Sequence, residues 1–258
     1  MRLLSVLLLA LPISLAARQA AACDGGVVAM IYQPAGAVFV AEVNGVPVGE
    51  ALEPGQSFTG TRRLPPWLLP GTNEVAVFVE TPSDEGAIEV FLNCPEVLAS
   101  GPGKNANSFG VLRLDAAGRQ AFDFEAPAGS TVDLPYSDAV HAGNAGLDDR
   151  VRAMQAAFRA GDVGAIVDEF ATMRDVAAAM GQPIGRDQMQ GMLSQVLPQA
   201  DVSYLDAWSI REAMGGRLRV VTGPDRVTPP ILMDGGRFRM KTARIWSHID
   251  GDWRIVAQ

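Results

Sequence analysis

The first half of the chain alternates hydrophobic and polar residues in short runs bounded by glycine, proline and other turn-forming residues. In the run at 74–80, Val75, Val77 and Val79 fall on one face, as they do in a half-buried strand. Strands are predicted at 26–33, 37–43, 46–48, 57–62, 74–80, 87–93, 109–115 and 120–125. Asn44-Gly45 separates two of these runs and is a strong signal for a two-residue hairpin turn. The pattern favours an antiparallel β-sandwich.

The hydrophobic residues take on a helical period near residue 147. The first stripe consists of Leu147, Val151, Met154 and Phe158. Gly161 is typical of the residue that ends such a helix, and Asp162 is predicted to cap a second helix at 163–173. Asp187 is predicted to cap a third helix, which ends before Pro198.

In the last part of the chain, hydrophobic and polar residues again alternate as they do in strands. These strands are predicted at 203–212, 217–222, 231–233, 237–248 and 253–257. Three helices followed by a curved antiparallel sheet form an α+β arrangement. We therefore predict a two-domain α+β protein, with a β-sandwich domain at 23–136, a polar linker at 137–146 and a three-helix, curved-sheet domain at 147–258.

Two segments of the second half resemble those of a known fold. They are the step Phe158-Arg159-Ala160-Gly161-Asp162 and the closing strand pair at 243–256, with its turn at Asp250-Gly251. Through them, residues 147–258 resemble the cone-shaped α+β fold of nuclear transport factor two and the polyketide-cyclase-like proteins. The resemblance implies a cavity between sheet and helices, and a homodimer through the open face of the sheet. It implies either an isomerase, dehydratase or cyclase, or a binding or secretion-accessory domain without chemistry.

The first half is similar to immunoglobulin-like and galactose-binding-like sandwich modules. The likeness lies in Asn44-Gly45 and in the run at 67–75, which has the pattern of a turn entering a strand. It implies a fold and no particular ligand.

The N-terminus has the layout of a secretory signal peptide at 1–22. Met1-Arg2 gives a positive start, Leu3 to Ala17 is apolar, and Ala20-Ala21-Ala22 offers small residues for cleavage. The apolar run is too short for a membrane-spanning helix, which needs about 20 residues. We therefore expect an exported protein of the cell envelope, periplasmic or extracellular, without a transmembrane segment.

Cys23 and Cys94 are the only cysteines in the chain. In an oxidising compartment they predict one disulfide. The alternative is that Cys23 is the acylated first residue of a lipoprotein, which would make the protein a lipid-anchored scaffold. The chain has no Cys-x-x-Cys and no pair of histidines at ligand spacing, so no metal site is predicted.

The net charge and the absence of known motifs exclude several classes of function. A formal net charge of −8 argues against a nucleic-acid partner, because binding to phosphates needs a basic face. No complete phosphate-binding loop and no Gly-x-Ser-x-Gly nucleophile turn occurs, and no cofactor is predicted.

Four residues are candidates for catalysis. Alternation along the predicted strands 203–212 and 237–248 places Tyr204 and Asp206 on one face, and Arg244 and His248 on another. If both faces line one cavity, Asp206 and His248 form an acid–base pair and Arg244 orients an anion. The alternative is an Asp206–Arg244 ion pair across strands, with Tyr204 as a core aromatic. His141, in the linker, is a weaker candidate.

Three tryptophans are candidates for binding, namely Trp67, Trp208 and Trp246. Trp67 follows two prolines and is either an exposed aromatic platform or a plug at the end of the sandwich. The leading hypothesis is a non-enzymatic binding or accessory module for an envelope protein or a small-molecule ligand. The alternatives are a small-molecule isomerase, dehydratase or hydrolase, and the scaffold anchored at Cys23.

Overall fold

The computed structural model describes residues 26–51, 57–93, 102–105, 107–139, 142–235 and 239–257. The predicted signal peptide, Cys23, Cys94 and His141 lie outside these residues. The described chain is a mixed α+β protein with antiparallel sheets and four α-helices. No helix in this part of the chain is both long and apolar enough to cross a membrane.

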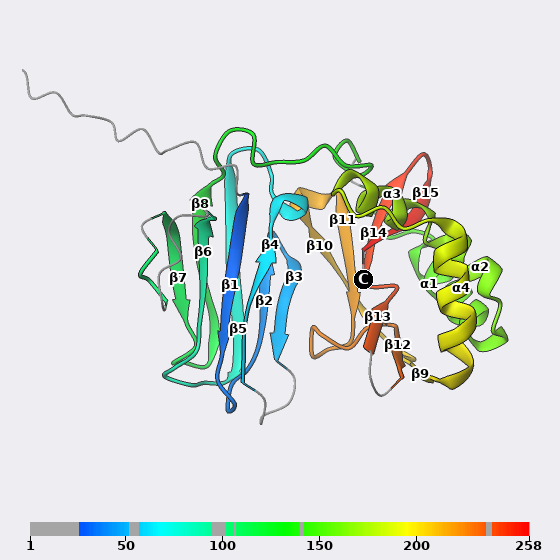
Figure 1. Ribbon diagram of the computed structural model, residues 1–258, viewed down its shortest axis with the longest axis horizontal. Helices are drawn as coiled ribbons and strands as arrows, with labels where there is room; N and C mark the ends of the chain where they lie inside the picture. Colours follow the sequence, from blue (N-terminus) through cyan, green and yellow to red (C-terminus); the bar gives the residue numbers. More distant parts are fainter. Residues whose placement is uncertain are drawn as a thin grey trace, which may run out of the picture.

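The N-terminal half forms two four-stranded antiparallel sheets that lie face to face (Figure 1). The first has the order β4-β1-β6-β7, with β4 Phe58–Arg63, β1 Val27–Gln33, β6 Ala87–Leu92 and β7 Ser108–Arg113. The second has the order β3-β2-β5-β8, with β3 Val46–Ala51, β2 Val38–Val43, β5 Thr72–Thr81 and β8 Gly118–Glu125. Alternate residues of both sheets share one hydrophobic core, and the strands predicted from the sequence are confirmed.

The helices number four in the described chain, so the prediction of three was wrong. They are α1 Leu147–Ala160, α2 Val163–Glu169, α3 Ala171–Ala179 and α4 Arg186–Val196. The predicted second helix is broken at Phe170, whose backbone (φ −84°, ψ 8°) departs from helical values. Because of the break, Phe170 packs in the core beneath α1 and α2. Val176 of α3 packs in a different hydrophobic core, together with Val220 and Ile245. Asp162 caps α2 as predicted, but the N-cap of α4 is Gly185, and Asp187 lies in its first turn.

The strands of the C-terminal half form two sheets where one curved sheet was predicted. One has the order β10-β11-β14-β15, with β10 Ser209–Ala213, β11 Leu218–Thr222, β14 Ile245–Ile249 and β15 Asp252–Ala257. The other has the order β13-β12-β9, with β13 Arg239–Thr242, β12 Ile231–Asp234 and β9 Asp201–Tyr204. The predicted strands 203–212 and 237–248 each divide between the two sheets, the second at Ala243, which has a positive φ of 59°.

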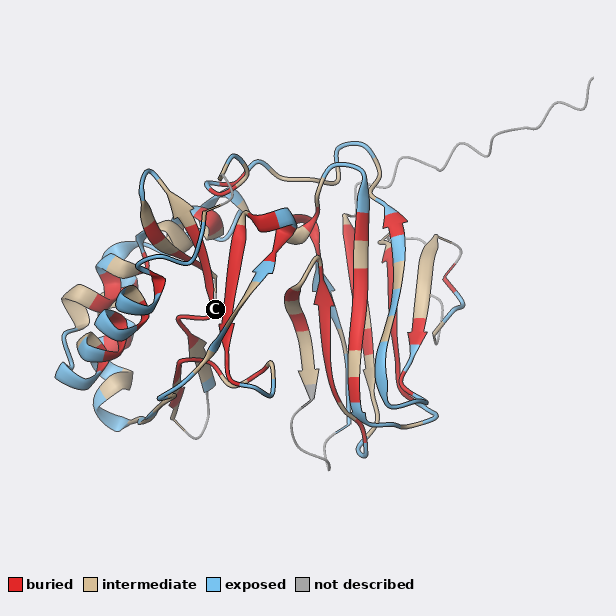
Figure 2. Ribbon diagram, turned by 180° about the vertical axis from the view of Figure 1, so that it is seen from behind, coloured by how far each residue is buried: buried red, intermediate tan, exposed pale blue. Residues whose placement is uncertain are grey.

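The sheet β10-β11-β14-β15 is covered on both faces. Val221 and Trp246 belong to the core shared with the helices, whereas Val220 and Ile245 belong to a cluster that also contains Val46 of β3. The second face therefore packs against the outer face of sheet β3-β2-β5-β8. Figure 1 shows the resulting layers, which are the two sheets of the N-terminal half, the sheets of the C-terminal half and the helices. Figure 2 shows many buried residues in the strands of these sheets.

The predicted linker is tied to both halves. Just before it, the Tyr136 hydroxyl donates to the carbonyl of Pro66 (2.6 Å) and its ring stacks on Trp67. At its other end, the Trp253 indole donates to the carbonyl of Ala145 (2.9 Å). The chain between β8 and α1 is thus anchored on each side of the interface.

Candidate functional site

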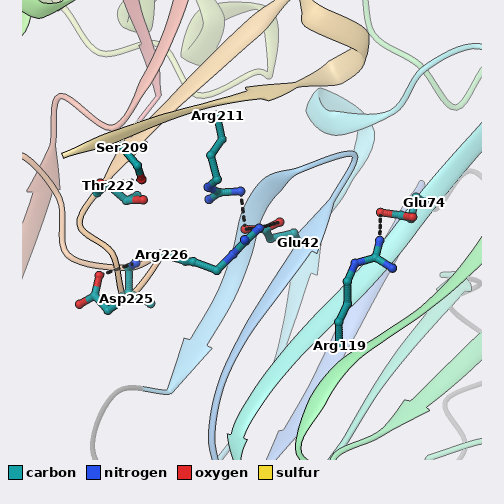
Figure 3. A network of polar contacts seen from close by, with 9 residues as sticks. Glu42, Glu74, Arg119, Ser209, Arg211, Thr222, Asp225 and Arg226 are labelled. Carbon is teal, nitrogen blue, oxygen red and sulfur yellow. Dashed lines mark hydrogen bonds and ion pairs between the residues drawn. The ribbon is translucent and has the colours of Figure 1, made fainter.

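A buried carboxylate, Glu42, lies where the two halves meet. Ala41 and Val43 point into the core between the first two sheets, so Glu42 points outward from β2, toward the C-terminal half. Its side chain is only 4% exposed. Arg211 of β10 approaches one carboxylate oxygen (Nη1 to Oε1, 3.0 Å), and Arg226, from the loop after β11, approaches the other (Nη2 to Oε2, 3.1 Å; Figure 3).

The side chain of Arg226 forms one rim of this cluster. Its guanidinium lies over the ring of Phe78 at 3.7 Å from the centroid, and Arg119 lies 5.8 Å from the same centroid. Arg119 is paired with Glu74, and both side chains are nearly half exposed. Phe78 therefore contacts both a partly buried arginine and a half-exposed one.

A second carboxylate, Glu50, lies on the same sheet face, because it pairs with Val40, two residues before Glu42. Glu50 Oε1 accepts from Lys241 of β13 and from Arg244 Nη1 (3.4 Å), and Arg244 Nη1 also lies 3.2 Å from Glu50 Oε2. Burial, reinforced by the charge of Arg244, lowers the pKa of Lys241 to about 8. Burial also lowers the pKa of Arg244 to about 10. One carboxylate shared by two buried cations compensates neither of them fully.

The cluster contains buried donors without an acceptor. Four guanidinium nitrogens of the cluster have no hydrogen-bond partner in the described part of the chain, namely Arg211 Nε and Nη2, Arg226 Nε and Arg244 Nε, and neither has the hydroxyl of Thr222. One buried acceptor, Glu50 Oε2, also lacks a hydrogen-bond partner. A buried donor that is left unpaired costs about 1–3 kcal/mol. Four unpaired guanidinium nitrogens against one unpaired carboxylate oxygen leave the cluster with more donors than acceptors, so acceptor atoms are missing there.

Arg219 is the contrasting case of a buried arginine with a purely structural role. It donates to Asn144 (2.8 Å) and to the carbonyls of Gly216, Leu218 and Ala142, and it is also paired with Glu212. Its guanidinium nitrogens are all engaged. A buried arginine of this fold can therefore be fully paired, whereas Arg211, Arg226 and Arg244 are not.

The charges of the cluster do not balance. Four cations, Arg211, Arg226, Arg244 and Lys241, pair with two carboxylates. Asp225 adds a third negative charge nearby, but its oxygens already accept hydrogen bonds from the amides and hydroxyl of the turn that follows it. One positive charge remains unmatched even when Asp225 is counted.

Arg244 is the one predicted catalytic candidate that belongs to this cluster. The predicted pairing with Asp206 was wrong, because Arg244 is buried and pairs with Glu50 of the N-terminal half. Arg244 also lies between β13 and β14, so it does not share a strand face with His248. Lys241, on the neighbouring strand β13, is largely buried against Glu50.

The other three catalytic candidates lie away from the cluster and in separate surroundings. Tyr204 ends β9, and Arg159 covers its ring at 4.3 Å from the centroid. Asp206 is exposed at a bend between β9 and β10. His248, in β14, packs edge-on against Trp253. Burial raises the pKa of Tyr204, and Arg159 partly opposes this shift.

The three tryptophans proposed for binding are engaged within the protein. Trp246 is fully buried and donates to the carbonyl of Ala243 (2.7 Å). Trp208 donates to Asp148 (2.7 Å), and its ring lies near the guanidinium of Arg152. Trp67 stacks on Tyr136 at the junction of the halves.

Sequence reasoning missed Glu42, Arg211 and Arg226 as site residues. The one local signal was Glu42, a single acidic residue inside the hydrophobic run of β2. Because a strand with one solvated face carries charged residues there, that signal does not distinguish burial from exposure.

No group of three or more histidine, cysteine, aspartate or glutamate side chains in the described part of the chain is arranged to hold a metal ion. Comparison with family models, with curated proteins and with solved structures finds no match for this chain.

Proposed function

We propose that this protein is an exported, non-enzymatic binding module of the cell envelope, whose ligand site lies between a β-sandwich domain at 23–136 and an α+β cone domain at 147–258. The layout of residues 1–22 supports export. The separate hydrophobic cores of the two halves support a division into domains. The resemblance of the second half to cone-shaped proteins supports a ligand held at the sheet.

The observation that carries the proposal is the set of buried guanidinium nitrogens without acceptors at the interface. An interface that served only to join the halves would gain nothing from leaving them unpaired, because apolar residues there would be as stable or more so. Sites for ligands keep such donors ready, and a ligand supplies the missing acceptors.

The chemistry of the cluster suits binding better than proton transfer. Arginine stays protonated over the physiological range, so it can orient and neutralise a ligand but does not act as a general base. The three arginines approach from different segments of the C-terminal half, whereas both carboxylates come from one sheet of the N-terminal half. A ligand held there would contact both halves at once.

The test is NMR on protein labelled with ¹⁵N-arginine. A chemically diverse set of neutral, cationic and anionic small molecules is added, and the Nε–Hε signals are followed. We expect at least one compound to shift the signals of Arg211, Arg226 and Arg244 while leaving that of Arg219 in place. If no compound of any class moves the three signals, the site does not bind small ligands and the proposal fails.

A further inference from the structure

We infer that Arg211, Arg226 and Arg244 bind an oxyanion with at least two acceptor oxygens, a phosphate or carboxylate group, between the two halves of the molecule. This inference rests on the proposed function and names the class of ligand.

Two of the three guanidinium groups lie side by side. Arg211 Nη1 is 3.0 Å and Arg226 Nη2 is 3.3 Å from the same oxygen of Glu42, so one carboxylate oxygen holds both groups in place. Of the remaining nitrogens, Arg211 Nε and Nη2 and Arg226 Nε are buried and unpaired. Because a guanidinium presents its donors in a rigid planar fork, fixing one nitrogen also fixes the direction of the others.

The third guanidinium, that of Arg244, belongs to the same electrostatic cluster. It pairs with Glu50, which lies on the same sheet face as Glu42, because its strand partner Val40 is two residues before Glu42. The Arg244 side chain is only 5% exposed, and its Nε has no partner. Such a buried cation is favourable only when an anion compensates it, and Glu50 is shared with Lys241.

The unpaired groups select the chemistry of the ligand. Guanidinium nitrogens donate and cannot accept, so a cation or a ligand that offers only donors finds no partner among them. The unmatched positive charge favours a negative ligand over a neutral one. Phosphate and carboxylate groups fit the forked geometry with two oxygens each. The hydroxyl of Thr222, which is also unpaired, can donate to a further oxygen.

Arg226 is the most exposed of the three arginines. This side chain is 32% exposed, whereas that of Arg211 is 20% exposed and that of Arg244 is buried. The exposure of the donor side chains therefore decreases from Arg226 through Arg211 to Arg244. The charged group of a ligand would enter past Arg226, and the rest of the ligand would remain near Phe78 and the solvent.

The experiment measures binding by calorimetry and by the midpoint of thermal unfolding. The probes are sodium phosphate and sodium succinate, each compared with sodium chloride at matched ionic strength. The variants are Arg211→Lys, which keeps a cation beside Glu42 but removes the fork, and Arg226→Lys at the partly exposed rim. The matched control is Arg119→Lys, at the half-exposed arginine that also contacts Phe78. Circular dichroism confirms that each variant folds.

We expect phosphate or succinate to raise the unfolding midpoint beyond the effect of chloride, and the stronger probe identifies the class of acceptor. Arg211→Lys and Arg226→Lys should weaken this binding about tenfold or more, because each loses charge-assisted hydrogen bonds, whereas Arg119→Lys should change it less than twofold. Equal effects in all variants would show screening by salt alone and overturn the inference.

The outcomes separate the inference from the function on which it rests. If neither anion binds but a neutral or cationic compound shifts the arginine signals, the ligand class is wrong and the binding function stands. If no compound shifts them, both fail, and ordered water alone completes the hydrogen bonds of the cluster.

Discussion

The carbonyl of Asn44 accepts a hydrogen bond from the amide of Met214 at 2.8 Å, and both residues have left-handed backbones (φ 49° and 53°). Asn44 starts the hairpin turn between β2 and β3, and Met214 follows β10 directly. The turn that the Asn44-Gly45 dipeptide predicts is therefore also a point where the C-terminal half docks. A local sequence signal thus fixes one end of a long-range interface.

Replacing Asn44 should destabilise the protein through its side chain as well as its backbone. Its amide group donates to the carbonyl of Trp67 (2.7 Å) and to Asn73 (2.8 Å), and its oxygen accepts from the amide of Glu74 (3.0 Å). We expect Asn44→Ala to lower the free energy of unfolding by about 2–4 kcal/mol, measured by urea denaturation. Asn44→Gly, which tolerates the positive φ, should lose less. Equal losses in the two variants would mean that the backbone conformation contributes nothing.

Removing the buried carboxylate should cost far more than removing an exposed one on the same sheet. Glu42→Gln leaves Arg211 and Arg226 without their anion, and breaking a buried pair typically costs about 3–5 kcal/mol. Glu74→Gln, which affects only the exposed pair with Arg119, should cost about 0–1 kcal/mol. Both are measured by urea denaturation, and similar values for the two variants would show that Glu42 is hydrated rather than buried.

Lys241 should make stability rise with pH above about 8. Its pKa in the folded state is about 8, below the value of about 10.4 for an unfolded chain. Between these values the unfolded state holds a proton that the folded state lacks, so the free energy of unfolding increases with pH. Burial and the charge of Arg244 lower this pKa, and the contact with Glu50 opposes them.

The measurement compares wild type with Lys241→Met from pH 7 to 9.5. Wild type should gain stability relative to the variant over this interval. NMR of ¹³C-lysine-labelled protein gives a direct check, since Lys104 is the only other lysine and Lys241→Met assigns the signal. A Lys241 signal that titrates above pH 10 would contradict the prediction.

Tyr136 should resist ionisation, because burial raises its pKa above that of an exposed tyrosine. The unfolded state then loses its proton first, and the stability contributed by the neutral phenol falls as the pH rises above about 10. We expect the difference in unfolding free energy between wild type and Tyr136→Phe to change over this range. Absorbance at 295 nm should show that Tyr136 ionises only as the protein unfolds. Ionisation near pH 10 in the folded state would show that the phenol is hydrated.

The sequence predicts elements well where a local pattern decides them. In the N-terminal half, alternation and turn residues place β1 to β8 within a few residues of their bounds. In 203–212 and 237–248, hydrophobic and polar residues continue to alternate across the point at which the chain leaves sheet β13-β12-β9 and enters sheet β10-β11-β14-β15. The positive φ of Ala243 depends on packing between distant segments, and alanine carries no signal for it.

The site could not be predicted for a related reason. In the sequence, Glu42 does not differ from a solvent-exposed acidic residue. It is buried because Arg211 and Arg226, which are distant in the sequence, pack against it in the folded protein. Burial and ion pairing of this kind depend on tertiary structure, which neither period nor composition encodes. Arg244 was singled out as a group that orients an anion, but its partner was sought within its own half of the chain.

The coverage of sheet β10-β11-β14-β15 by the protein's own N-terminal half has a consequence for self-association. The resemblance to cone-shaped proteins implies a homodimer through this sheet face, yet residues such as Val220 and Ile245 already pack there in a cluster with Val46 of the same chain. A second copy can occupy the face only by displacing that half. A dimer of this kind would form only after the halves of each monomer separate, so it would form slowly and at the expense of the folded interface.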